Sequence, residues 1–127
     1  MARQYSDDYY KGNQLSQYSM DRYINLSEVI TVGRINREYK TVGEESYEEY
    51  YFKLVFENGW FIVLSVNTRQ FNDSKNYDEY TPYDEEVEME YRRAKAIKYI
   101  LKTYKQVIKC IKKGKHSVKI PVLFSIN

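Results

Sequence analysis

Two neighbouring blocks of opposite charge hold most of the side chains that could do ionic chemistry in this 127-residue chain. Residues 73–90 contain eight acidic side chains and one basic residue, Lys75, whereas residues 92–115 contain ten basic side chains and no acid. The formal net charge of the whole chain is nevertheless only +2. A local field of this kind favours an ionic partner, but it identifies neither the partner nor a reaction.

The lysines of the basic block recur every three or four residues, which places them in one row along a helix. The row lies roughly 100–150° around the helix from the expected apolar seam, so it should face solvent or a partner. Lysines that neutralise phosphates give affinity without sequence preference, and the same row could meet an acidic protein surface. The alternative without function is a solvated helix face. The candidate nucleic-acid-binding residues are Arg92, Lys95, Lys98, Lys102, Lys105 and Lys109.

The acidic block is interleaved with some of the 15 tyrosines of the chain. Tyrosine is favoured at protein interfaces, and the acids could meet a basic pocket on a partner. Their spacing lacks the pattern of a calcium-binding loop, so no metal site is predicted. The alternative is a solvated loop followed by a helix start, where the helix dipole favours acids. The candidate protein-binding residues are Asp73, Tyr77, Asp78, Glu79, Tyr80 and Tyr83.

Residue types that catalysis needs are scarce in this chain. His116 is the only histidine and Cys110 the only cysteine, and we expect an exposed loop residue and a packed thiol at these positions. The five glycines are scattered, so the sequence has no phosphate-binding glycine loop. We therefore predict a non-enzymatic protein with no cofactor.

Composition favours one globular domain spanning residues 1–127, of which residues 1–12 are candidates for a mobile segment. No stretch has the apolar length of a membrane span, and the N-terminus has no signal-peptide core. The lone cysteine excludes an internal disulfide. We therefore expect a cytoplasmic protein that does not bind a membrane.

The first half of the chain predicts mainly strands. We expect a short helix at residues 14–23, a strand at 26–35, and a charged connection or edge strand at 36–47. Residues 50–66 form the clearest unit, because two strand-forming runs flank Asn58 and Gly59, a strong hairpin signal. A two-residue turn would place Leu54 opposite Val63 and make both hairpin faces apolar. The hairpin should then be central in the sheet and covered on each side.

A helix of about 32 residues is predicted after this hairpin. Thr81 and Pro82 suit its first turn, and Gly114 suits its C-terminal cap. A strand at residues 118–126 closes the chain. The predicted fold is therefore α+β, an antiparallel sheet of about four strands packed against one long C-terminal helix. The predicted apolar seam of the helix comprises Ala94, Ile97, Leu101, Tyr104, Ile108 and Ile111, broadened by Ile100 and Val107.

No family is recognised from a specific motif. The order helix, three strands, then a helix carrying Arg92, Arg93 and Lys95 resembles double-stranded RNA-binding domains over residues 14–113, although here an acidic turn precedes the basic residues and an extra strand follows. The small size and segregated charge are also similar to phage or mobile-element inhibitors such as anti-CRISPR proteins. We expect an inhibitor or adaptor that binds a macromolecule, with a protein favoured as partner and nucleic acid as the alternative.

Overall fold

The computed structural model describes residues 21–71 and 85–127. Its elements follow the α+β pattern, with antiparallel strands before and after one long helix. In chain order they are β1 (Asp21–Asn25), β2 (Val29–Val32), β3 (Asn36–Val42), β4 (Glu45–Phe56), β5 (Phe61–Asn67), the short 3₁₀ helix η1 (Thr68–Phe71), α3 (Glu85–Lys112), β6 (Ser117–Pro121) and β7 (Ser125–Ile126).

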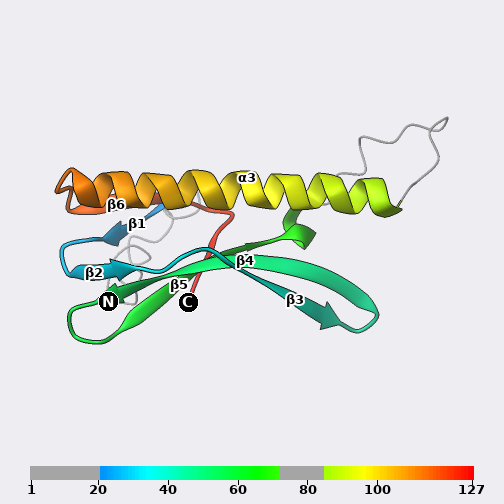
Figure 1. Ribbon diagram of the computed structural model, residues 1–127, viewed down its shortest axis with the longest axis horizontal. Helices are drawn as coiled ribbons and strands as arrows, with labels where there is room; N and C mark the ends of the chain where they lie inside the picture. Colours follow the sequence, from blue (N-terminus) through cyan, green and yellow to red (C-terminus); the bar gives the residue numbers. More distant parts are fainter. Residues whose placement is uncertain (1–20, 72–84) are drawn as a thin grey trace, which may run out of the picture.

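The described residues form two layers, with α3 lying along one face of the main sheet (Figure 1). That sheet has five antiparallel strands in the order β2-β4-β5-β7, and β3 pairs with the remaining length of β4. A second sheet pairs β1 with β6 beside the C-terminal part of the helix. The expected class, an antiparallel sheet packed against a long C-terminal helix, is confirmed.

The β4–β5 hairpin has a register different from the one expected. Leu54 pairs with Ile62 and Val55 with Phe61. The amide of Phe56 donates to the carbonyl of Trp60 at 2.8 Å, so the loop consists of residues 57–59, three rather than two. The amide of Gly59 donates to the carbonyl of Phe56 at 2.9 Å, and Gly59 has a φ of 88°. Three-residue hairpin loops of this type place a glycine in the left-handed region after the turn. Asn58 and Gly59 therefore mark the turn, but its length was predicted wrongly.

This shift of one residue changes which side chains share a face, because strand side chains alternate. The face toward α3 carries seven apolar residues of the two strands, and all seven are buried. The opposite face carries Lys53, which is exposed, and Phe61, which is 51% exposed. The expectation that both faces of the β4–β5 hairpin are covered by other elements is therefore wrong. The buried face consists of Tyr50, Phe52, Leu54, Phe56, Ile62, Leu64 and Val66.

The buried side of α3 is also rotated from the predicted seam. Ala94 is exposed and Leu101 is 41% exposed, although both were expected to face the core. The fully buried apolar residues instead centre on Ile100 and Val107, which the sequence placed at the margin of the seam. Ile97, Tyr104 and Ile111 of the predicted seam are partly buried against the core. Thr103 belongs to this buried side, so apolarity alone could not locate its centre. The buried residues of this side are Ala96, Ile100, Thr103, Val107 and Cys110.

The end of α3 follows the sequence prediction. Gly114 has a φ of 71°, and its amide donates to the carbonyl of Ile111 at 3.0 Å. The next amide, of Lys115, reaches back to the carbonyl of Cys110 at 2.9 Å. These two bonds form a Schellman motif, which satisfies carbonyls that have no partner within the helix. The predicted helix start at Thr81 and Pro82 lies outside the described residues.

Two further expectations differ in detail from the structure, and one alternative is decided. Residues 21–23 belong to strand β1 rather than to the end of a helix, and the rest of the expected helix at 14–23 lies outside the described residues. Of the two alternatives at 36–47, the edge strand is present, as β3. The expected closing strand is split into β6 and β7 by a turn, in which the amide of Phe124 donates to the carbonyl of Pro121 at 3.1 Å.

The observed orientation of α3 makes a testable prediction. Ile100→Ala should lower the free energy of unfolding by about 2–5 kcal/mol, because it removes a side chain that is only 1% exposed from the core. Leu101→Ala, one residue along, should cost less than about 1 kcal/mol. Chemical denaturation of the two variants measures the difference. Equal losses would contradict the observed orientation.

Candidate nucleic-acid interface

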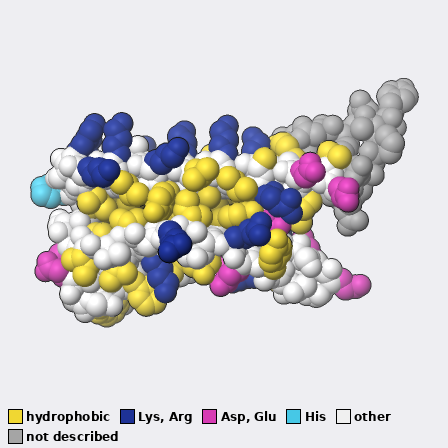
Figure 2. Space-filling view, viewed as in Figure 1, with side chains coloured by type: hydrophobic (Ala, Val, Ile, Leu, Met, Phe, Trp, Pro, Cys, Tyr) yellow, Lys and Arg dark blue, Asp and Glu magenta, His cyan; other side chains and the backbone are white. Residues whose placement is uncertain are grey.

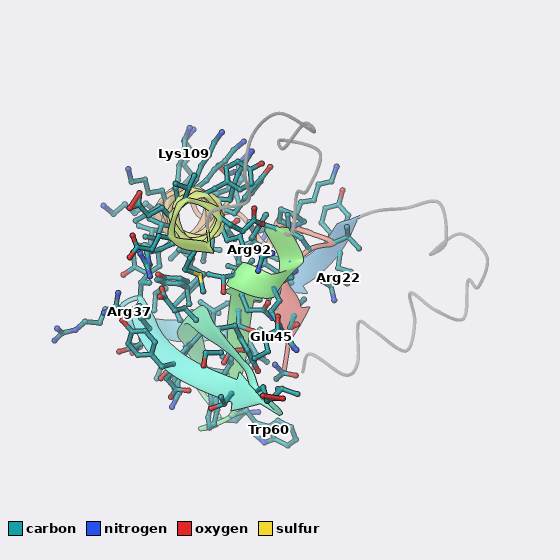
Figure 3. The ribbon with its side chains drawn as sticks, turned by 90° about the vertical axis from the view of Figure 1, so that its right-hand side faces the viewer. Arg22, Arg37, Glu45, Trp60, Arg92 and Lys109 are labelled. Carbon is teal, nitrogen blue, oxygen red and sulfur yellow. The ribbon has the colours of Figure 1, made fainter. Side chains whose placement is uncertain are left out.

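Five lysines form one exposed row on α3, and we name this row the lysine ridge. The packing of Ile100 and Val107 against the sheet directs the opposite side of the helix to solvent, and the ridge lies there. Lys109 points away from the sheet in the view along the helix (Figure 3). The row spans about 21 Å of the helix axis at 1.5 Å per residue. The ridge consists of Lys98, Lys102, Lys105, Lys109 and Lys112.

The lysine ridge is not neutralised by the part of the chain that the structure describes. None of its ammonium groups has an ion pair there, although five other basic–acidic contacts occur in the same residues. Figure 2 shows dark-blue side chains projecting in a row from the outer side of α3, with acids near the other end of the helix. The described protein therefore presents a line of positive charge to solvent.

This arrangement works against the stability of the helix. Like charges three or four residues apart on a helix destabilise it by about 0.2–0.5 kcal/mol per pair. The ridge contains four such adjacent pairs, which amounts to about 1–2 kcal/mol. The helix dipole favours Lys109 and Lys112 near the C-terminus, but its effect falls off within the last turn. Lys98, Lys102 and Lys105 therefore remain uncompensated, and a bound polyanion would relieve their repulsion.

The other two candidate nucleic-acid-binding residues do not belong to the ridge. The guanidinium of Arg92 donates from Nε to a carboxylate oxygen of Glu88 at 2.7 Å, and Glu88 is buried. The ammonium of Lys95 lies 5.6 Å from the ring centroid of Tyr91, where a cation–π contact forms. Both side chains are half-buried. The ridge proper therefore begins at Lys98.

The candidate protein-binding residues lie outside the described part of the chain, and of the acidic block only 85–90 is described. These candidates are Asp73, Tyr77, Asp78, Glu79, Tyr80 and Tyr83. Among the tyrosines of β4, Tyr50 is buried, whereas Tyr47 lies 4.2 Å beneath the guanidinium of Arg69. Both therefore make contacts within the described part of the chain.

A buried ion pair that the sequence did not predict holds the first half of α3 against the sheet. Glu48 of β4 is 2% exposed and accepts hydrogen bonds from Arg93 at 2.7–3.1 Å. The hydroxyl of Tyr50 donates to the same carboxylate at 2.6 Å, and the amide of Glu48 donates to the hydroxyl of Thr68 at 3.0 Å. Sheet, η1 and helix therefore meet at one residue, Glu48: the helix through its carboxylate and η1 through its backbone amide.

The sequence contained a signal for this ion pair. Glu48 shares its alternation with Tyr50, Phe52, Leu54 and Phe56, so it lies on the face of β4 that turns toward the helix. A carboxylate on an apolar face requires a cationic partner. Burial of that face therefore predicts a basic residue on the opposing helix. Arg93 was counted in the basic block, but it points inward.

Each member of this cluster affects the ionisation of the others. Hydrogen bonds from Arg93 hold the pKa of Glu48 below its ordinary value of 4.5. Burial, reinforced by the hydrogen bond to Glu48, raises the pKa of Tyr50 from 10.0 to about 12. The folded protein therefore stabilises an ionised Glu48 beside a neutral Tyr50.

Residues 21–71 and 85–127 contain no group of three or more His, Cys, Asp or Glu side chains that could hold a metal ion. No helix in the same residues combines the length and apolarity needed to cross a membrane. Cys110 is a buried thiol, and His116 is exposed just beyond the end of the helix.

Comparisons of the chain with models of protein families, with curated proteins and with solved structures gave no match.

Replacing Arg93 should reveal how strongly the buried pair holds the helix. Arg93→Ala should lower the free energy of unfolding by about 2–3 kcal/mol, because it leaves the Glu48 carboxylate buried without its cation. The expected loss is moderate because the Arg93 side chain is 37% exposed. The matched control is Arg69→Ala, whose exposed pair with Glu45 spans 3.8 Å and should contribute less than about 1 kcal/mol. Urea denaturation measures both, and a loss in the control equal to that in Arg93→Ala would contradict a special role for the buried pair.

The same cluster predicts that the stability of the fold decreases at both low and high pH. The stabilisation from Glu48 is fully present above its unfolded pKa and is lost as the pH falls through its lowered folded pKa. The stabilisation from Tyr50 is present below pH 10.0 and is lost as the pH rises toward about 12. Urea denaturation midpoints measured as a function of pH should therefore fall at both the acid and the alkaline end. Tyr50→Phe should make the decrease at alkaline pH smaller, whereas the control Tyr47→Phe should leave it unchanged. An unchanged alkaline decrease in Tyr50→Phe would contradict the assignment of this decrease to Tyr50.

Proposed function

We propose that this protein is a non-enzymatic module that binds nucleic acid by contacting phosphates with the lysine ridge. The observation that supports this proposal is the row of five exposed lysines without ion pairs in the described part of the chain. Each lysine that neutralises a phosphate releases a condensed counterion, and this release supplies affinity.

The chemistry of the ridge favours contact with the backbone rather than with bases. Its cations are ammonium groups, which act as point charges and lack the planar fork that arginine uses to read guanine. Among the described residues, the exposed aromatic side chains lie on or beside strands rather than on α3; they are Tyr23, Tyr39, Trp60 and Phe61. In the view along the helix, Trp60 lies on the side of the sheet opposite Lys109 (Figure 3). Stacking of unpaired bases beside the ridge is therefore not expected, and duplexes should bind at least as well as single strands.

A protein partner remains the competing proposal, in which the acidic segment 73–90 and its tyrosines contact a host protein, as an inhibitor of the anti-CRISPR type would. Its support is the sequence pattern alone, because most of that segment lies outside the described residues. The described surface favours the nucleic-acid alternative.

A binding experiment separates the two proposals. Fluorescence anisotropy with labelled duplex and single-stranded DNA of mixed sequence, at several salt concentrations, should show binding that weakens steeply with salt. The logarithm of the association constant should fall with the logarithm of salt concentration with a slope of about −4 for duplex, because each of the five lysines contributes at most about −0.9. The absence of binding at low salt would overturn the proposal and favour a protein partner.

Charge reversal on the ridge has a matched control elsewhere. Lys102→Glu/Lys105→Glu should weaken duplex binding at least tenfold and flatten the salt slope by about 2. Arg34→Glu/Lys53→Glu changes the net charge equally at two exposed residues away from α3 and should lose much less affinity. Equal losses in the two variants would indicate attraction by net charge alone, and the ridge would then not be the site.

A further inference from the structure

The edge strand β3 has all seven of its residues exposed and pairs, in the described structure, with β4 alone. It forms a hairpin with β4 that extends from the body of the molecule below the start of α3 (Figure 1). Its register with β4 is continuous from Asn36 to Val42, with no bulge, and it contains no proline. Bulges and prolines are among the devices that keep exposed sheet edges from pairing with another chain.

The register shows which backbone groups of β3 are free. Val42 and Glu45 close a two-residue turn, so they form a hydrogen-bonded pair, and the pattern alternates from there. The backbone groups of residues 36, 38, 40 and 42 therefore point toward β4. Those of Arg37, Tyr39 and Thr41 point away from the sheet. The amide of Gly33, which donates to the carbonyl of Lys53 at 2.8 Å on the same edge of β4, agrees with this phase.

We propose that β3 pairs with β3 of a second copy of this chain, antiparallel and about a two-fold axis at Tyr39. In this register Tyr39 faces Tyr39 of the second copy, and Arg37 faces Thr41. Both are hydrogen-bonded pairs that use the three free amides and carbonyls of each strand. The two sheets would then continue into one.

Charge selects this register over its neighbours. With the axis at Tyr39, Glu38 of each copy faces Lys40 of the other, at non-hydrogen-bonded positions where side chains lie closest. A shift that moves the axis to residue 38 would place two Glu38 side chains face to face. A shift to residue 40 would place two Lys40 side chains face to face. Like charges in such positions are destabilising, so the central register is the self-complementary one.

The pairing side chains are already held in place within one chain. The ammonium of Lys40 lies 2.9 Å from Glu49 and 3.8 Å from Glu38, and Tyr51 donates a hydrogen bond to Glu38 at 3.2 Å. These residues lie on the face of the sheet away from α3, because Glu48 and Tyr50 alternate with them on the inner face. The interface is a single pair of short strands, so the dimer should be weak and depend on concentration.

Sedimentation velocity of the full chain without nucleic acid tests this inference. The wild type should show a monomer–dimer equilibrium that shifts with protein concentration. Glu38→Lys and Lys40→Glu should each sediment as monomers, because each places like charges across the axis. An equimolar mixture of the two variants should recover the dimer, because every cross-strand pair is then opposite in charge. Glu57→Lys, which makes the same charge change in the exposed β4–β5 turn, should behave as the wild type.

A backbone variant decides the matter if the charge variants do not fold. Tyr39→Pro removes an amide that points away from β4, so the β3–β4 ladder keeps its hydrogen bonds while the dimer should be lost. Circular dichroism confirms folding of each variant. A wild type that remains monomeric at its solubility limit would overturn the proposal. It would also be overturned by a folded mixture that fails to dimerise, or by a Tyr39→Pro variant that dimerises normally.

Discussion

Burial of a single face of the main sheet under α3 is the constraint on which the rest of the structure depends. The helix covers the side of β4 and β5 that carries Phe52, Leu54 and Leu64, each 0% exposed. This packing sets the rotation of α3 and therefore the direction of the lysine ridge. It also forces Glu48 into the interior, where the carboxylate needs Arg93. The core, the buried ion pair and the exposed charge thus follow from one packing arrangement.

The charge reversal of the sequence separates into parts with different physical explanations. Lys112 at the helix end is explained by the dipole, and Arg92 and Arg93 neutralise the buried carboxylates of Glu88 and Glu48. These explanations do not account for Lys98, Lys102 and Lys105 in the middle of the lysine ridge, whose mutual repulsion destabilises the helix. A surface that is maintained against its own electrostatic penalty is better evidence of binding than a charge count.

Local signals predicted the fold class, the long helix, its cap at Gly114 and the turn at Asn58 and Gly59. They failed where the answer depends on distant residues. The turn glycine is compatible with a two- or a three-residue loop, and the longer loop is the one that places Ile62 and Leu64 on the buried face. In the same way, Thr103 is buried and Leu101 is half-exposed because of what lies opposite them. The ridge was predictable because exposed charge follows helical periodicity, whereas Glu48 could be found only after the correct face was known.

The pairing of β1 with β6 joins segments that are far apart in the chain, and this has a consequence for folding order. Arg22 bonds to the carbonyl of Pro121, 99 residues away, and reaches Val122 and Phe124 as well. Contacts of such separation carry a large loop-closure entropy and form late. During synthesis, Ile24 and Leu26 should therefore remain exposed until β6, near the end of the described residues, has been made. The hairpins and α3 can form from local contacts first, so we expect the small β1–β6 sheet to complete the fold last.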